Sequence, residues 1–188
     1  RHRDASFIRI YFRYICVQNR SMYTEYQPSH LLVPYIDNYW EFKGNPDYGM
    51  RIHILPDGCT DFIFTLGEVA NAVEEGSLIM QPYRSYFVGP MTKYSELVTY
   101  TESIHMFGVR FLPCGLSCFT NLPLHEFVNS RVSTNEMKAV FDDTFIEKLG
   151  EQKHVTDRIR VVEEYLLAYL ARHYQPADSH VAMAVLSL

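Results

Sequence analysis

The residues best suited to chemistry are polar side chains within a strand-like part of the sequence: His53, Asp57, Asp61, Arg84, Tyr86, His105 and Arg110. Arg110 is the most informative, because strand alternation puts it on the same face as Met106 and Leu112. A charge on an apolar strand must be paired, or it must face water or a ligand. We expect Arg110 to form a salt bridge with Asp57 or Asp61 that joins two strands, in preference to direct contact with a ligand.

Catalytic and metal-binding patterns are weak in this sequence. Cys114 and Cys118 have i, i+4 spacing and His105 precedes them, but zinc sites usually carry Cys-x-x-Cys or His-x-His pairs. There is no Gly-x-Ser-x-Gly elbow and no glycine-rich phosphate loop, and no histidine can be assigned to Cys59 as a partner. We therefore expect buried thiols, with no catalytic residue, no metal and no cofactor.

Aromatic residues are abundant, with 14 Tyr, 12 Phe and one Trp. Tyrosine at this density suits a lined cavity or an interface, although packing in the core is its commoner use. Ligand cavities combine such surfaces with a few polar groups. The candidate ligand-binding residues are therefore Tyr39, Trp40, His53, Tyr86 and Arg110, each of which also fits a place in the core.

From Tyr23 to about Val132, short runs rich in Tyr, Phe, Ile and Val are separated by Pro, Gly, Asn and Asp, as is typical of β-strands. Eight short strands favour a β-barrel or jelly roll. We expect strands near Leu31–Val33, Ile36–Phe42, Arg51–Leu55, Asp61–Leu66, Gly76–Met80, Tyr86–Val88, Tyr94–Thr99 and Ile104–Phe111.

The clearest turn in the sequence is formed by Pro56, Asp57 and Gly58. Proline presets the backbone angle, aspartate can accept a hydrogen bond from the following backbone, and glycine tolerates a left-handed conformation. This turn predicts a β-hairpin over Arg51–Leu66.

After Val132 the apolar spacing changes from two to about 3.6 residues, which indicates helices. Ser133 has a glutamate three residues later, the spacing of a capping box, and Gly150 stands where a left-handed cap would end the helix. A second helix should run from about Thr156 to Gln175, before Pro176. Two helices are therefore expected after the strands.

The second helix has apolar residues over a wide arc, which predicts two packing neighbours. One neighbour would be the β-structure or the first helix, and the other could be a second subunit. The pattern equally fits a helix whose whole apolar arc is buried within one chain. The candidate dimerisation residues are Val162, Tyr165, Leu166 and Tyr169.

Length and composition limit the protein class. The 188 residues are 47% hydrophobic, which excludes intrinsic disorder and fits one domain with a small appendage. Charged residues and prolines interrupt every apolar run before the roughly 18 residues of a membrane span. Four cysteines without a secretory leader predict a reduced, cytoplasmic protein. The net charge of −5 argues against DNA binding by these residues themselves.

The two ends of the sequence differ from the rest. Residues 1–21 hold five arginines and a single acid, which fits an upstream translation artefact, a cloning remnant, an added edge strand or a basic arm that touches a phosphate backbone. Residues 177–188 read as the start of a further helix that stops in mid-pattern. We therefore expect the chain to be the front part of a longer protein.

Five segments stand in order between Met22 and Pro176: Tyr26-Gln27-Pro28, Leu31 to Trp40, Ile54 to Phe64, Phe87 to Thr92, and Gly108 to Pro113. Together they resemble the N-terminal sensor domain of bacterial AraC-type transcriptional regulators, in the branch that carries Leu-Pro-Asp-Gly and Val-Gly-Pro segments. Cys114 departs from this pattern, since relatives often have glycine there, and residues 1–21 have no counterpart. The structural motif residues of these segments are Pro56, Asp57, Gly58, Asp61, Gly89 and Pro90.

The resemblance implies a mainly β fold, a cupin-like double-stranded β-barrel (jelly roll) at residues 22–132, followed by two packed helices at 133–176 that mediate a homodimer. Residues 177–188 would begin a truncated helix-turn-helix domain, through which alone the intact protein would bind DNA. The expected function is to sense a small-molecule effector or a partner protein. The alternatives are a freestanding metal-dependent cupin enzyme acting on a small polar substrate, and a dimerisation module with a filled barrel.

Overall fold

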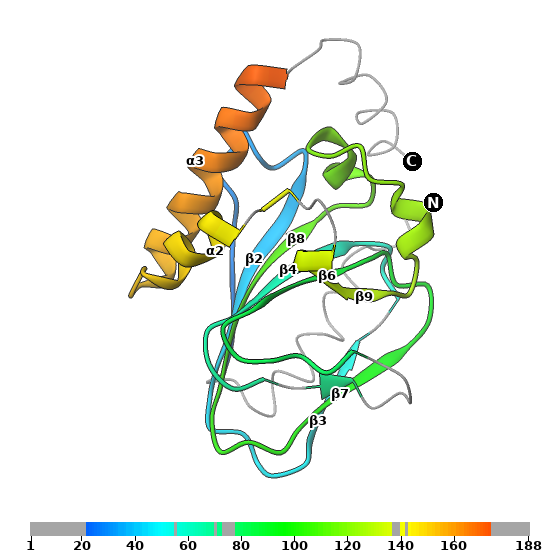
Figure 1. The fold of residues 1–188 in the computed structure, drawn as a ribbon, viewed down its shortest axis with the longest axis vertical. Coiled ribbons are helices and arrows are strands. Elements are labelled where there is room, and N and C mark those ends of the chain that lie inside the picture. Colours follow the sequence, from blue (N-terminus) through cyan, green and yellow to red (C-terminus); the bar gives the residue numbers. More distant parts are fainter. Residues whose placement is uncertain are drawn as a thin grey trace, which may run out of the picture.

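The computed structural model of the protein describes residues 22–54, 56–69, 71–72, 78–136, 140–141 and 143–173. The predicted basic extension at residues 1–21 and the predicted helix start at 177–188 lie outside these residues. The described parts are mainly antiparallel β, followed by two α-helices (Figure 1). No helix among them is long and apolar enough to cross a membrane. The elements are β1 (Tyr23–Tyr26), β2 (Ile36–Gly44), β3 (Met50–Ile54), β4 (Thr60–Thr65), β5 (Asn71–Ala72), β6 (Ser85–Val88), β7 (Ser95–Thr99), β8 (Ile104–Phe111), β9 (Arg131–Ser133), α2 (Asp143–Gly150) and α3 (Val155–His173), with short 3-10 turns at Gly115–Cys118, Leu124–Phe127 and Thr134–Glu136.

The described strands form two sheets with antiparallel pairing throughout. The larger sheet has the order β1-β2-β8-β4-β6-β9, and the smaller sheet has the order β3-β7-β5. Figure 1 shows the helices against the larger sheet, with β3 and β7 well away from them. Within the larger sheet the register sets Trp40 opposite Gly108 and Asp61 opposite Arg110. These two pairings position the candidate site.

The larger sheet is covered on both faces, and every residue of β4 is buried. Because side chains alternate along a strand, neighbours on β4 enter different cores. Phe62 and Phe64 belong to the cluster under the helices, together with Phe141 and Leu166. Ile63 belongs to the second cluster, which lies between the two sheets. The sequence pattern of a strand buried on both faces is nearly continuous rather than alternating.

Of the two predicted helices, the second is confirmed and the first is corrected at its start. The second forms as α3, over Val155–His173. The first begins only at Asp143, because Arg131–Ser133 is the edge strand β9, paired with β6. Ser133 is therefore a strand residue, and its capping-box spacing is coincidental. The open edge of β6 supplies hydrogen bonds that outweigh the local helix preference.

The predicted strand at Leu31–Val33 is wrong. The segment is a tight turn in which the Leu32 amide donates to the Ser29 carbonyl at 2.8 Å and the Ile36 amide donates to the Leu32 carbonyl at 2.9 Å. Leu32 is fully buried, whereas Leu31 is 55% exposed and Val33 is 53% exposed. This alternation of exposed and buried side chains has the two-residue period of a β-strand, which explains the wrong prediction. The strand expected at Gly76–Met80 lies partly outside the described residues, and residues 78–80 are not in a strand.

The predicted hairpin over Arg51–Leu66 is also wrong, although its turn forms as expected. Gly58 has a φ of 71°, and the Cys59 amide donates to Asp57 Oδ1 at 2.9 Å. However, β3 pairs with β7, whereas β4 pairs with β6 and β8. The turn therefore carries the chain from one sheet to the other.

Candidate functional site

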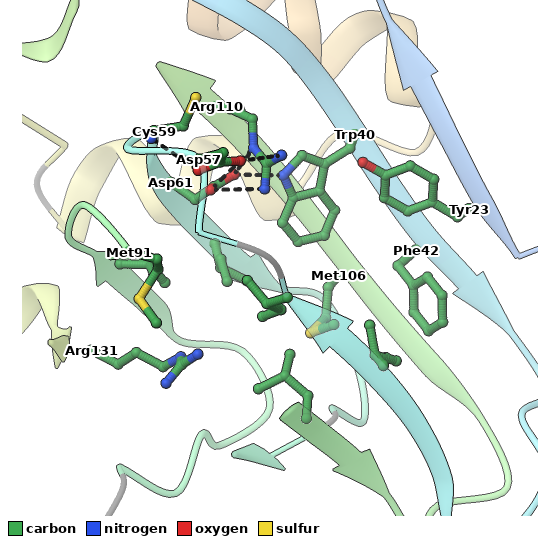
Figure 2. Close-up of a pocket in the computed structure, with 15 residues that line it drawn as sticks. Tyr23, Trp40, Phe42, Asp57, Cys59, Asp61, Met91, Met106, Arg110 and Arg131 are labelled. Carbon is green, nitrogen blue, oxygen red and sulfur yellow. Dashed lines mark hydrogen bonds and ion pairs between the residues drawn. The ribbon is translucent and has the colours of Figure 1, made fainter. Parts of the chain in front are cut away.

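A cavity lies between the two sheets, at the end where the chain crosses from β3 to β4 (Figure 2). Its volume is about 60 Å³, several times the roughly 10–15 Å³ that one water needs. Strands of both sheets contribute to its wall, including β1 at the edge of the larger sheet. Residues after the turn between β3 and β4 also contribute. The lining residues are Tyr23, Trp40, Phe42, Ile52, Ile54, Asp57, Cys59, Asp61, Ile63, Val88, Met91, Leu97, Met106, Arg110 and Arg131.

Arg110 and two carboxylates form the polar end of this cavity. Arg110 Nε lies 3.2 Å from both oxygens of Asp61, and Nη2 lies 3.2 Å from Asp61 Oδ2. Arg110 Nη1 lies 3.2 Å from Asp57 Oδ2. The side chains of all three residues are less than a fifth exposed. The ion pair predicted from the sequence is therefore confirmed, with both carboxylates as partners.

Burial and mutual charge shape the protonation of this group. Burial raises the pKa of Asp57 above its usual range, although the Arg110 guanidinium opposes this shift. Burial alone would lower the pKa of Arg110, but Asp61 and Asp57 outweigh it and raise that pKa. Burial, reinforced by Asp57, also raises the pKa of the Cys59 thiol. Cys59 is consequently a neutral thiol and a poor nucleophile.

Trp40 closes the same end of the cavity from β2. Its indole Nε1 donates to Asp61 Oδ1 at 2.9 Å, and its ring stacks on Tyr23 with the ring centroids 6.1 Å apart. The indole lies across Gly108, where any Cβ would overlap its atoms. Sequence reasoning misses Gly108, because a glycine within a strand indicates a close approach without naming the partner.

The structure brings two of the five predicted ligand-binding residues, Trp40 and Arg110, into the cavity wall. Tyr39 is a correction: it faces the helix-covered core, because residues adjacent on a strand point to opposite faces. Tyr86 is buried between the sheets but is not part of the wall, and its hydroxyl accepts the Gln81 amide at 2.6 Å. His53 lies on β3, and its side chain is outside the described structure.

The remaining polar residues singled out from the sequence lie away from the cavity wall. Arg84 is exposed, and His105 is paired with Glu41 at 2.9 Å.

Gly89 and Pro90 have a structural role, since a Cβ on Gly89 would overlap the backbone of Phe127. The Gly89 amide donates to the Ser130 carbonyl at 3.0 Å, and the Pro90 carbonyl accepts the Asn129 amide at 3.0 Å.

Residues 24–133 match a family described as a domain of unknown function, DUF6597. The match covers more than half of the chain and includes almost every strand of both sheets. The chain belongs to the DUF6597 family. A comparison with curated proteins found no match.

The DUF6597 match stops at β9, so α3 and its predicted dimerisation residues lie outside it. Val162 and Leu166 are fully buried in the core of the chain itself. Tyr165 donates its hydroxyl to the Val140 carbonyl at 2.6 Å, and Tyr169 packs on Phe119 with ring centroids 5.9 Å apart. Val162 and Leu166 are therefore unavailable to a partner, whereas the dimer itself and a role in it for the partly exposed Tyr165 and Tyr169 stay predictions.

Among the described residues of this DUF6597 protein, no three His, Cys, Asp or Glu side chains are grouped as a metal site requires. Cys59, Cys114 and Cys118 carry no disulfide, and Cys114 is exposed. The expected absence of a metal stays a prediction. Elemental analysis of the purified protein tests it, since stoichiometric iron, manganese, zinc or nickel would favour the cupin-enzyme alternative.

Proposed function

We propose that this chain is the effector-sensing and dimerisation domain of an AraC-type transcriptional regulator. In this proposal a small molecule binds between the two sheets, which together make a cupin-like double-stranded β-barrel, and binding changes how an attached helix-turn-helix domain is held. The carrying observation is the cavity, whose wall comes from both sheets and ends at Arg110. Ligand cavities of this kind are mostly apolar with a few oriented polar groups.

A sensor must couple its cavity to a distant element, and β2 has the required contacts. Trp40 faces the cavity, while its neighbours on β2 face α3. Tyr39 donates its hydroxyl to Glu163 Oε1 at 3.3 Å. Burial raises the pKa of Tyr39, so the hydroxyl keeps its proton. A shift of β2 around a ligand would therefore reach α3 through a direct hydrogen bond.

The second contact from β2 to α3 is a buried ion pair. Arg158 Nη1 donates to Glu41 Oε1 at 3.0 Å, and the Arg158 side chain is only 6% exposed. His105 Nε2 lies 2.9 Å from the same oxygen. The hydrogen bond with His105 holds the pKa of Glu41 below its usual range, which keeps the carboxylate charged. An effector can act only if it binds one of two conformations of the protein more tightly than the other. Because β2 contacts both the cavity and α3, a conformational change at the cavity can reach α3.

The homodimer is also part of the proposal, with a smaller interface than the sequence predicts. Val162 and Leu166 are committed to the core, so a partner helix would use the partly exposed side of α3 that carries Leu167 and Leu170. Dimerisation would set the spacing of the two attached DNA-binding units, and hence of their half-sites. Sedimentation velocity across a range of concentrations tests this part, and a monomer at every concentration would contradict it.

Thermal-shift screening with metabolite pools tests the sensing function. A ligand at about 100 times its dissociation constant should stabilise the fold by roughly 2.7 kcal/mol. Val88→Phe, which fills the cavity, should abolish the shift that a pool gives to the native protein. Val33→Phe is the matched control, because Val33 is exposed and away from the cavity. No shift with any pool, or an equal shift in both variants, would contradict the proposal and favour a filled barrel.

A further inference from the structure

We infer that the cavity between the sheets takes a compact, neutral and largely apolar molecule, an inference that rests on the proposed sensing function. Four observations carry it: the apolar wall, the mutual pairing of the polar groups, the balance of charge among the lining residues, and the volume of the cavity. Each limits a different property of the ligand.

Beyond the cluster around Arg110, the wall of the cavity consists mostly of hydrocarbon and thioether side chains, with Arg131 as the further charged residue of the lining. They come from both sheets, and Figure 2 shows Phe42 and Met106 beyond the cluster around Arg110. A ligand with many hydroxyl groups would lose its water there without finding replacement hydrogen bonds, at a cost of about 1–3 kcal/mol for each unpaired group. The principal apolar side chains of the wall are Phe42, Ile52, Ile63, Val88, Leu97 and Met106.

The polar groups at the end of the cavity are already paired with one another. Asp61 accepts from Trp40 and Arg110, and both of its oxygens are engaged. Asp57 accepts from the Cys59 amide with one oxygen and pairs with Arg110 through the other. A ligand that needed several strong hydrogen bonds would have to break these pairs. A ligand with few polar groups leaves these pairs intact.

Among the described residues that line the cavity, the formal charges cancel. Asp57 and Asp61 oppose Arg110 and Arg131, and Arg131 Nη2 also donates to Ser95 Oγ at 2.7 Å. A charged ligand would add an uncompensated charge to a site of low dielectric constant, which is strongly unfavourable. The volume of about 60 Å³, room for roughly four to six water molecules, favours a compact molecule.

Trp40 provides a direct readout, because it is the only tryptophan of the 188 residues and lines the cavity. The experiment titrates the protein with cyclohexanol, cyclohexanecarboxylate, cyclohexylammonium and glucose, and follows Trp40 emission excited at a wavelength that none of the four absorbs. We expect cyclohexanol to change the emission and to bind about tenfold or more tightly than each of the other three. In Val88→Phe the response should disappear, and in Val33→Phe it should remain.

The outcomes separate this inference from the sensing function. Tighter binding of the carboxylate, the ammonium ion or glucose, abolished by Val88→Phe, would overturn the ligand class and leave the sensing function in place. A metabolite pool that raises the melting temperature while cyclohexanol gives no response would overturn the ligand class in the same way. If neither the four compounds nor any pool gives a response, both proposals are wrong.

Discussion

Replacing Arg110 with methionine tests the ion-pair cluster at the polar end of the cavity. The change keeps an unbranched side chain but leaves the carboxylates of Asp57 and Asp61 buried without their cation. Removing one partner of a buried pair costs about 3–5 kcal/mol. For a chain of this size each kcal/mol lowers Tm by roughly 2–4 °C, so Arg110→Met should lower it by about 6–20 °C.

The matched control is Arg51→Met, because Arg51 makes a similar ion pair on the surface. Its Nη1 lies 2.8 Å from Glu96 Oε2, but the Arg51 side chain is 61% exposed. Exposed pairs contribute about 0–1 kcal/mol. Urea unfolding followed by Trp40 fluorescence and circular dichroism measures the free energy of unfolding of both variants. Equal losses in the two variants would refute the assignment of Arg110 to a buried network.

The pH dependence of Arg110→Met gives a second, independent check. Burial already raises the pKa of Asp57 in the folded protein against the opposing effect of Arg110. A carboxyl with a raised folded pKa costs stability above its unfolded pKa, and that cost disappears as the pH falls through the folded value. Without Arg110 the pKa of Asp57 should rise further, and each tenfold fall in its acid dissociation constant corresponds to about 1.36 kcal/mol. The deficit of Arg110→Met should therefore shrink in acid, and a deficit independent of pH would contradict this reasoning.

Three other substitutions test the surrounding structure. Gly108→Ala should displace the Trp40 indole, cost about 1–3 kcal/mol in urea unfolding and shift Trp40 emission, and unchanged emission would contradict the close approach. Leu166→Asp should unfold the helix-covered core as judged by circular dichroism, whereas Leu166→Met should cost under about 1.5 kcal/mol of unfolding free energy. A Leu166→Asp protein that stays folded and only loses its dimer would contradict the burial of Leu166. Glu41→Gln should lower the free energy of unfolding at neutral pH, because the hydrogen bond with His105 lowers the pKa of Glu41. This loss of stability should vanish as acid protonates the native carboxylate, and a loss that is constant with pH would contradict the pairing.

The sequence predicts two features of the site well, one turn and one ion pair. The Pro56–Gly58 turn forms with the expected left-handed glycine, and Arg110 finds the carboxylates expected of it. The turn follows from local residue preferences, and the pairing of Arg110 follows from the cost of an unpaired charge on an apolar strand, although Asp61 lies 49 residues away in the chain. Trp40 is predicted as an aromatic residue near polar groups, and it lines the cavity, but Tyr39 and Tyr86, which the same criterion selects, do not.

The failures concern long-range partners. The hairpin over Arg51–Leu66 is a local prediction, but β3 and β4 each pair with strands far along the chain. Tyr39 shares the aromatic character of Trp40, although alternation separates the two when both faces of a strand are buried. Leu166 lies on an apolar stripe whose neighbour a single sequence does not identify. In each case the missing information is which surface covers a given face.

The central claim is that a ligand in the cavity changes how well α3 is protected from local opening. Hydrogen exchange of the α3 amides tests this claim most directly. The exchange is measured with and without the metabolite pool that gives the largest thermal shift, in the native protein and in Glu41→Gln. We predict slower exchange on β2 and a changed rate across Arg158–Leu166, with the change in α3 reduced in the variant. Protection confined to the cavity strands, with the α3 rates unaltered, would contradict the account.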